Sequence, residues 1–316
     1  MKSMLRRVLM LLATMIIVSF LTYVAFELIS GDAAEAMLGT QATPARVEAL
    51  RKELGLDAPF LVRYARWLLG FFSGDLGISY SYKQPVAELI APKLEVTLWM
   101  CLISFIIISV VSLPLGVLSY QSVVGKFGWI HTTLNQLLMA VPPFFTGILI
   151  SWGCGVILKF FTPGDFPDMH ADMAGAVRYL FFAAICIAIP RIAMMVRMMR
   201  STVINEMEKD YVQTAISRGN DRRGVLVGHV LKNSLVPAIT MLGQTMAEIV
   251  AGGIVVEQVF GIPGLGRLLV ASIANRDYPT VQAVVVILAF WVVFAGMAAD
   301  LVNQCVDPRL RLGGES

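Results

Sequence analysis

The chain of 316 residues is 57% hydrophobic and 15% charged, and its formal net charge is +3. Globular chains are roughly 45–50% apolar and about 25% charged, so this composition excludes an ordinary soluble domain, a disordered chain and a coiled coil. The small net charge argues against nucleic-acid binding, and the long apolar runs predict an all-α membrane protein that crosses the lipid bilayer several times.

A spanning helix needs about 20 mostly apolar residues, and six segments of the chain satisfy this requirement. We interpret the first as a retained span, because its apolar run is too long for a typical signal peptide. Pro142 and Pro143 in the third span, and Pro190 in the fourth, predict that both helices are bent. The predicted spans run over 8–30, 96–120, 134–161, 176–199, 235–256 and 281–302.

The distribution of basic residues predicts the orientation of these spans. Bases gather before the first span, between the fourth and fifth spans and after the sixth, whereas the connection between the third and fourth spans is acidic. Both termini are therefore expected in the cytoplasm. This orientation predicts an N-terminal span over 1–30, an external insertion over 31–95, a core transmembrane domain over 96–304 and a cytoplasmic tail over 305–316.

The external insertion is expected to be partly helical. Thr43 suits an N-cap and Pro44 suits the first helical position, which predicts a short helix that runs to Leu54 and ends at Gly55. A second, amphipathic helix is predicted over 59–72, and its aromatic side chains are typical of a membrane interface.

The sequence contains none of the common signatures of enzymes or nucleotide-binding proteins. It has no GxxxxGK[ST], HExxH or GxSxG motif, and the glycine-rich stretch over 261–266 is interpreted as a tight turn. The three histidines lie far apart, and the four cysteines form no CxxC pair. We therefore predict no catalytic residue, no bound cofactor and no metal site in this chain.

The loop between the fourth and fifth spans is the most informative segment. A helix is predicted over 205–218, with Gly219 as its C-terminal stop and with acids early and Arg218 late, as the helix dipole favours. Tyr211, Ala215 and Arg218 share one face at i, i+4 and i+7. Small Ala215 beside large Tyr211 makes a surface suited to a partner's groove. The alternative is a solvated basic loop that only obeys the positive-inside rule.

This loop resembles the coupling motif of the inner-membrane permease subunits of binding-protein-dependent ABC importers, in the oligopeptide, dipeptide and nickel branch. In that motif Glu-Ala-Ala is followed, four residues after its last Ala, by Gly. Here Gln213, Thr214 and Ala215 with Gly219 take those places, so the Glu and the first Ala are replaced. Further stretches that resemble this branch are Gly74–Ser79, Val255–Phe260, Pro263–Arg267, Asn275–Pro279 and Asp307–Arg309.

The resemblance implies the type I ABC-importer permease (MetI-like) fold with six transmembrane helices, in the bacterial cytoplasmic (inner) membrane. It also implies that residues 205–219 form a coupling helix that docks on a cytoplasmic ATPase. The implied partners are two ABC ATPase subunits that use ATP and Mg, a second and usually different permease, and an extracytoplasmic substrate-binding protein. The implied coupling residues are Tyr211, Gln213, Thr214, Ala215, Arg218 and Gly219.

Charged side chains inside the spans are costly and are treated as functional hypotheses. Glu248 lies in the middle of the fifth span with Gln244 one turn earlier, and it is expected either to line a pathway or to pair with a base such as Arg191. Other candidates lie at the outer end of that span and beside the proline pair of the third span, where packing is the alternative role. The pathway or gate candidates are Gln244, Glu248, Glu257, Phe260, Met139 and Phe144.

Three classes of function remain open. The first is the permease subunit of an ATP-driven importer, with peptides as the expected cargo and nickel or a metal chelate as the alternative. An intramembrane enzyme would need paired acids, for which Glu248 and Asp300 are the only deep candidates, and no GxGD motif supports them. A secondary transporter would predict an inverted repeat, which the sequence does not contain. The permease is therefore expected.

Overall fold

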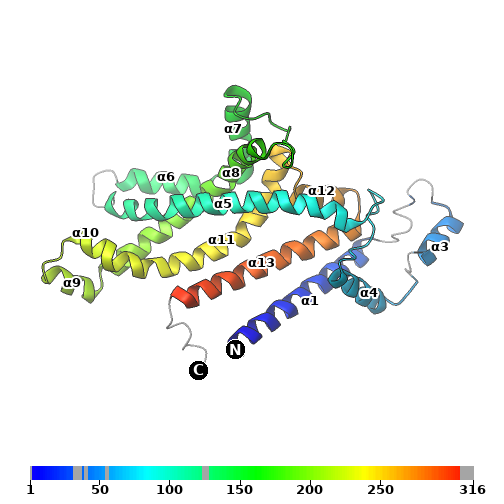
Figure 1. Cartoon of the computed structure of the whole chain (residues 1–316), viewed down its shortest axis with the longest axis horizontal. Helices are drawn as coiled ribbons and strands as arrows, with labels where there is room; N and C mark the ends of the chain where they lie inside the picture. The colour runs from blue at the N-terminus through cyan, green and yellow to red at the C-terminus, as the bar shows by residue number, and fades with distance from the viewer. Residues whose placement is uncertain (1, 31–37, 39–41, 54–56, 123–127, 307–316) are drawn as a thin grey trace. The chain divides into compact units, whose positions relative to one another are not determined.

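The computed structural model describes residues 2–30, 38, 42–53, 57–122 and 128–306 (Figure 1). Within these ranges the chain is almost entirely helical, and the only strand-like pairing is an isolated bridge between Ile78 and Pro85. The predicted all-α class is therefore confirmed. The predicted helix end at Gly55 and the Asp307–Arg309 motif lie outside the described residues.

Five described helices are long and apolar enough to cross a membrane, or six if one bent pair is counted as a single span. In chain order the described elements are α1 (Lys2–Ser30), α3 (Pro44–Glu53), α4 (Phe60–Ser73), α5 (Val86–Ser122), α6 (Gly128–Ala140), α7 (Pro143–Ile150), π-helical η2 (Ser151–Ile157), α8 (Met173–Met207), α9 (Asp210–Ser217), α10 (Arg222–Val225), π-helical η3 (Leu226–Val230), α11 (Leu231–Phe260), α12 (Leu265–Ala274) and α13 (Tyr278–Val306).

The third predicted span, over 134–161, corresponds to a bent pair of helices, α6 and the helix that α7 and η2 form. α6 stops at Ala140, and the helix that α7 and η2 continue lies at 94° to it. The cause is the proline pair, because Pro142 has an extended backbone with ψ of 144° and Pro143 has no N–H to donate back to α6. The predicted bend is thus confirmed here, whereas Pro190 lies inside α8 without ending that helix.

The chain divides into two compact units, which we describe separately. Unit 1 contains residues 1–97 and 263–293, and unit 2 contains residues 98–262 and 294–316. The helices α5 and α13 each contribute to both units.

Unit 1 is organised around aromatic packing between α1 and α4. The rings of Phe20 and Tyr23 contact those of Phe60 and Tyr64 with centroids 5.2–6.0 Å apart. The hydroxyl of Ser19 lies 2.9 Å from that of Tyr64, which adds a polar contact to this apolar interface. Both helices predicted in the external insertion are present, as α3 and α4.

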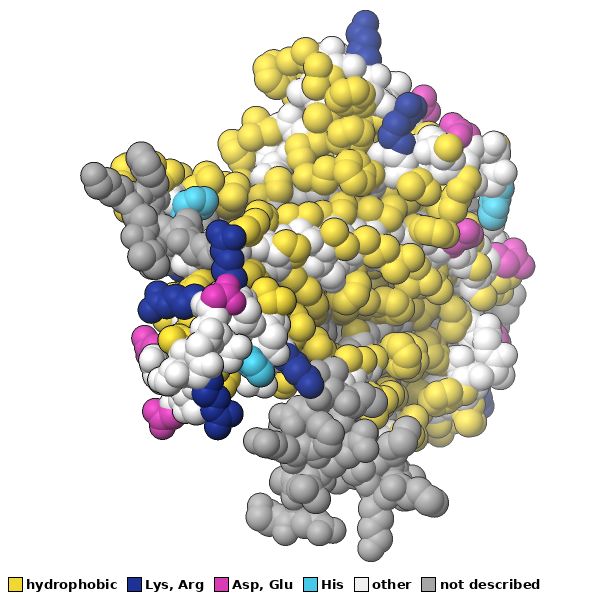
Figure 2. Space-filling view, turned by 60° about the vertical axis from the view of Figure 1, so that its left-hand side comes forward, with side chains coloured by type: hydrophobic (Ala, Val, Ile, Leu, Met, Phe, Trp, Pro, Cys, Tyr) yellow, Lys and Arg dark blue, Asp and Glu magenta, His cyan; other side chains and the backbone are white. Residues whose placement is uncertain are grey.

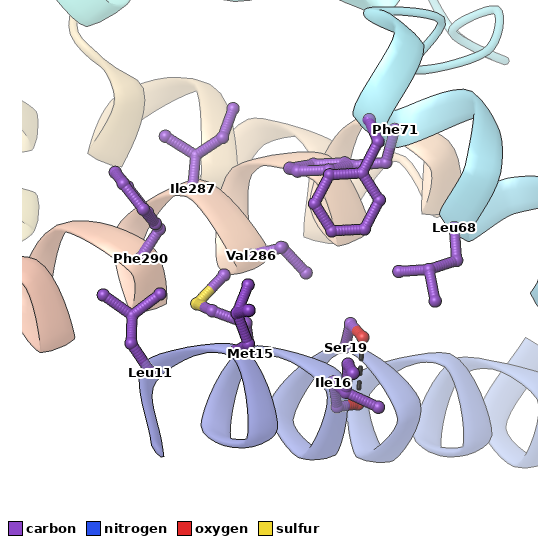
Figure 3. Close-up of a pocket in the computed structure, with 11 residues that line it drawn as sticks. Leu11, Met15, Ile16, Ser19, Leu68, Phe71, Val286, Ile287 and Phe290 are labelled. Carbon is purple, nitrogen blue, oxygen red and sulfur yellow. Dashed lines mark hydrogen bonds between the residues drawn. The ribbon is translucent and has the colours of Figure 1, made fainter. Parts of the chain in front are cut away.

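An apolar groove of about 290 Å³ lies among α1, α4 and α13 in unit 1 (Figure 3). Its one hydroxyl, on Ser19, is already hydrogen-bonded to the backbone oxygen of Ile16, so the groove presents hydrocarbon. Such a surface suits the interior of a membrane, as expected for a face of the first span. The lining residues are Leu11, Leu12, Met15, Ile16, Ser19, Leu68, Phe71, Phe72, Val286, Ile287 and Phe290.

Unit 2 is built around α8 and α11, which pack along each other. Small residues permit close helix contacts in this unit: an added Cβ at Gly116 on α5 would meet Met199 on α8 at 2.6 Å, and one at Gly243 on α11 would meet Ala299 on α13 at 1.8 Å. Figure 2 shows charged side chains gathered at the end of this unit that carries α9 and α10, beside a broad apolar surface.

Candidate functional site

The segment predicted as a single helix over 205–218 is divided between two helices, the end of α8 and α9. α8 ends at Met207, and α9 begins at Asp210 after Lys209, whose extended backbone has ψ of 150°. The prediction of one continuous helix is therefore wrong. Beside the break, the carboxylate of Glu206, at the end of α8, accepts hydrogen bonds from Lys209 and Tyr211.

Glu206 is a nearly buried carboxylate, 7% exposed, that joins three elements of unit 2. It accepts hydrogen bonds from the ammonium of Lys209 at 2.6 Å, from the hydroxyl of Tyr211 at 2.9 Å and from the side-chain amide of Asn233 at 3.0 Å. Charge-assisted hydrogen bonds of this kind are about twice as strong as neutral ones. The network therefore fastens α9 to the end of α8 and the start of α11.

Tyr211 is held in its donating form by this environment. Burial, the largest cause, and the hydrogen bond to Glu206 raise the pKa of Tyr211 above its ordinary value, against an opposing contribution from Asn233. The amide of Asn233 also lies 3.3 Å from the Tyr211 hydroxyl. The sequence indicates Glu206 only as an early acid of the predicted helix and does not link it to Asn233, because no local spacing connects residues that are 27 positions apart.

The inner face of α9 packs on a core cluster of unit 2. Val212 is fully buried there, and Tyr211, Ala215 and Ile216 pack against the same cluster. The predicted outward face of Tyr211, Ala215 and Arg218 is thus divided, because only Arg218 is exposed. The core cluster consists of Met199, Val203, Val212, Val225, Leu226, Val230 and Ala238.

The outer face of α9 is polar and exposed, and it includes Gln213, Thr214, Ser217 and Arg218. Of the predicted coupling residues, Tyr211 and Ala215 therefore pack inward, and the exposed ones are Gln213, Thr214 and Arg218. The segment thus has one side that is packed on unit 2 and one side that is exposed. A short helix of this kind can transmit a force applied to its outer face to the helices that hold it.

Gly219 ends α9 as predicted. Its φ of +91° is a left-handed conformation that glycine adopts without strain, and no atom lies within 4 Å of the position a Cβ would take. The amide of Gly219 donates to the carbonyl of Ile216 at 2.9 Å, and that of Asn220 donates to Ala215 at 3.3 Å. The chain then enters α10, whose first turn is capped by the side chain of Asp221.

The pathway candidate Glu248 is paired. The guanidinium of Arg191 on α8 donates to the carboxylate of Glu248 on α11, and the two side chains are 28% and 41% exposed. Of the two expectations for Glu248, the structure contains the ion pair. Gln244 lies one turn earlier on α11 and is exposed.

The remaining candidates are not gathered into one site. Glu257 and Phe260 are both fully buried near the end of α11, where the ring of Phe260 stacks on that of Phe161 with centroids 5.8 Å apart. Phe260 is thus a packing residue in this structure. Met139 is half-buried at the end of α6, and Phe144 is exposed on α7, beyond the bend.

No cluster of three or more potential metal ligands is present in the described part of the chain. The side chain of Asp300, the second acid considered for an intramembrane enzyme, is not among those described. The structure therefore presents two arrangements of interest in unit 2, the anchored helix α9 and the ion pair between Arg191 and Glu248.

Comparison with known families identifies relatives along nearly the whole chain. Residues 112–312 match the family described as binding-protein-dependent transport system inner membrane component, and residues 1–101 match the N-terminal region of membrane components of such systems. Together the two matches include α9, the segment over 31–95 and all of the spans except residues 102–111 of α5.

Individual relatives cover the chain end to end. A transport system permease protein of Brucella abortus (strain 2308) is 35% identical over 313 residues, covering 97% of this chain and 98% of the relative. The oligopeptide transport system permease protein of Bacillus subtilis (strain 168) is 33% identical over 308 residues, with 96% and 98% covered. The glutathione transport system permease protein of Pectobacterium atrosepticum is 31% identical over 309 residues, with 97% of each chain covered.

Proposed function

The chain belongs to the family of binding-protein-dependent transport system inner membrane components, and from this premise we propose that it is the permease subunit of an ATP-driven peptide importer. The names of the similar permeases, for oligopeptides and for glutathione, support peptides as the cargo over nickel or a metal chelate. Since both names denote short peptides, a small peptide is the proposed substrate class.

The anchored helix α9 carries the proposal for how transport is driven. Its exposed face would dock in a groove of a partner ATPase, with Gln213, Thr214 and Arg218 in contact with that subunit. Tyr211 and Ala215 would act from the inner face, by transferring the movement to α8 and α11 through the Glu206 network and the core cluster. Gly219 would let the chain turn away from the docked helix.

The partners follow from this role. Two ABC ATPase subunits would bind ATP and Mg, while this chain binds no cofactor and performs no hydrolysis. A second permease would complete the pathway, and an extracytoplasmic binding protein would deliver the peptide. The positive-inside pattern supports an orientation with both termini and α9 in the cytoplasm and with 31–95 outside.

Peptide uptake by cells is the direct test. Cells that carry the complete transporter should accumulate a radiolabelled dipeptide only while ATP is available, and unlabelled glutathione should compete. Arg218→Glu should reduce uptake at unchanged membrane abundance, because it reverses the charge on the exposed face of α9. Arg46→Glu on α3, also an exposed charge reversal, is the matched control and should leave uptake unchanged.

The same experiment separates the competing functions. Uptake that continues after ATP is depleted would contradict an ATP-driven importer. Competition by Ni²⁺ but not by peptides would contradict peptides as the cargo, while the proposed coupling role of α9 would still hold. Co-purification of ATPase subunits with the wild-type chain, and their loss with Arg218→Glu, would support docking on α9.

A further inference from the structure

The connection between η2 and α8 forms a pocket of about 470 Å³ that has no part in the proposed coupling. It lies within unit 2, and its walls combine apolar side chains with two bases and one acid. The lining includes Lys159, Phe160, Phe161, Asp165, Arg178 and Tyr179.

A tight turn forms one wall of this pocket. The amide of Asp165 donates to the carbonyl of Thr162 at 3.2 Å across Pro163 and Gly164, and Gly164 has φ of +82°, as a type II turn requires. The turn packs directly on η2, because a Cβ at Gly155 would approach Pro163 to 2.5 Å. Gly155 thus permits a contact that a larger residue would prevent.

Tyr179 forms another part of the pocket wall and contacts the turn. Its hydroxyl accepts a hydrogen bond from the amide of Gly164 at 3.0 Å and donates one to the carbonyl of Phe260. The ring of Phe161 contacts that of Tyr179 edge to face, with centroids 4.9 Å apart. These contacts fix the shape of the pocket before any ligand enters, which lowers the entropic cost of binding.

Lys159 occupies a position that favours glycine. It lies just after η2 and has φ of +53°. The residues on either side of it close the end of η2: the amide of Leu158 donates to the carbonyl of Gly153 at 3.0 Å, and the amide of Phe160 donates to the carbonyl of Cys154 at 2.9 Å. A side chain in this left-handed conformation is strained, and such strain gathers at functional sites. This strained residue is also one of the residues that line the pocket.

The two bases that line the pocket, Lys159 and Arg178, form no ion pair among the described residues. Both side chains are exposed. The other acids of this connection are engaged in local structure. Asp168 accepts from the amide of His170 at 2.8 Å, and Asp172 accepts from that of Gly175 at 2.8 Å. The pocket therefore offers two cations against one carboxylate, that of Asp165.

The surroundings indicate the kind of anion. Next to the bases, η2 exposes Trp152, Val156 and Ile157, so the cations lie where a bare apolar helix meets polar loop residues. In a chain that spans a membrane, this is the boundary between acyl chains and headgroups, where Arg and Lys meet lipid phosphates. We propose that the pocket binds a bilayer phospholipid, with its phosphate held by Lys159 and Arg178 and an acyl chain along η2.

Lipid binding to the purified full-length chain tests this proposal. In mild detergent, after delipidation, phosphatidylglycerol should raise the unfolding midpoint of the wild-type chain, and native mass spectrometry should detect the bound lipid. Lys159→Gly and Arg178→Gln should each weaken this binding about tenfold, as expected for the loss of a charged hydrogen-bond partner. Lys159→Gly should also raise the lipid-free midpoint, because glycine relieves the left-handed strain.

Lys83→Gly is the matched control, since Lys83 also has a left-handed backbone, with φ of +56°, but belongs to unit 1 and is not among the residues that line the pocket. It should raise the lipid-free midpoint and leave phosphatidylglycerol binding unchanged. The proposal would be overturned if both pocket variants bound the lipid like the wild type. It would also be overturned if inorganic phosphate, diacylglycerol or a dipeptide stabilised the chain as much as phosphatidylglycerol does. The test requires no transport activity and is independent of the peptide cargo.

Discussion

The hydroxyl of Ser79 donates a hydrogen bond to the carboxylate of Asp277, although the two residues are 198 positions apart in the sequence. Asp277 also accepts from the amide of Tyr80 at 2.9 Å and from the hydroxyl of Thr280 at 2.9 Å. Ser79, Asp277 and Thr280 are fully buried in unit 1. One buried carboxylate thus ties the connection between α4 and α5 to the start of α13.

Asp277→Ala is expected to destabilise unit 1 by about 3 kcal/mol, because it leaves buried donors of Ser79, Tyr80 and Thr280 without their acceptor. Asp277→Asn keeps one acceptor oxygen and should cost less, and Ser79→Ala should cost about 1 kcal/mol. Thermal unfolding combined with limited proteolysis of the connection between α4 and α5 measures this order. Equal stability of Asp277→Ala and the wild type would contradict the role of the carboxylate.

Gly219→Val should destabilise the end of α9, because its φ of +91° is unfavourable for any residue with a Cβ and especially for a β-branched one. Gly219→Asn should be tolerated much better, since Asn enters the left-handed region more readily. Space is not at issue, as no atom lies within 4 Å of the added Cβ. The expected difference is about 1–2 kcal/mol in unfolding free energy, and peptide uptake should fall in the same order. Similar losses for both variants would refute a conformational cause.

Glu206→Gln and Asn233→Ala should show strong non-additivity, because the two side chains share one hydrogen-bond network. We expect a coupling of about 0.5–3 kcal/mol in a double-mutant cycle of unfolding free energies. Thr240→Ala serves as the control partner for Glu206→Gln, since the Thr240 hydroxyl bonds only to its own helix, and that cycle should be additive. Additive losses in the first cycle would show that α9 is not held by this network.

Arg191→Glu and Glu248→Arg should each reduce stability, since each places two like charges at the contact between α8 and α11. The double variant restores opposite charges and should recover much of the loss. Thermal unfolding of the four chains gives the interaction energy, and peptide uptake by the same chains tests for a pathway role. A double variant that is stable but inactive would support pathway lining by this pair, whereas full recovery of both would support a structural role alone.

Tyr80 should make unit 1 sensitive to alkaline pH. Burial, with smaller contributions from Tyr23 and Asp277, raises the pKa of Tyr80 from 10.0 to about 12. Since the folded state holds this proton more tightly than the unfolded state, the stabilising contribution is complete below pH 10 and is lost as the pH rises towards 12. Tyr80→Phe should therefore lose less stability than the wild type between these pH values in thermal unfolding.

Several features of the fold could be predicted because they depend on neighbouring residues only. The apolar runs predict the spans, Pro142 and Pro143 predict the bend between α6 and α7, and Gly219 predicts the end of α9. The candidate site was predicted less completely. Spacing placed Tyr211 and Arg218 on one face, but it could not show that Glu206 accepts hydrogen bonds from Tyr211 and Asn233, or that Tyr211 packs against the core cluster.

The sequence by itself determined that this chain is a helical membrane permease, because hydropathy, proline positions and family motifs are local properties of the chain. Tertiary structure alone decided which acid each buried donor meets, as with Ser79 and Asp277. It also decided that Lys159 and Arg178 share a pocket. Side chains that meet in space from distant positions leave no periodic signal, because their contacts arise only when the helices pack.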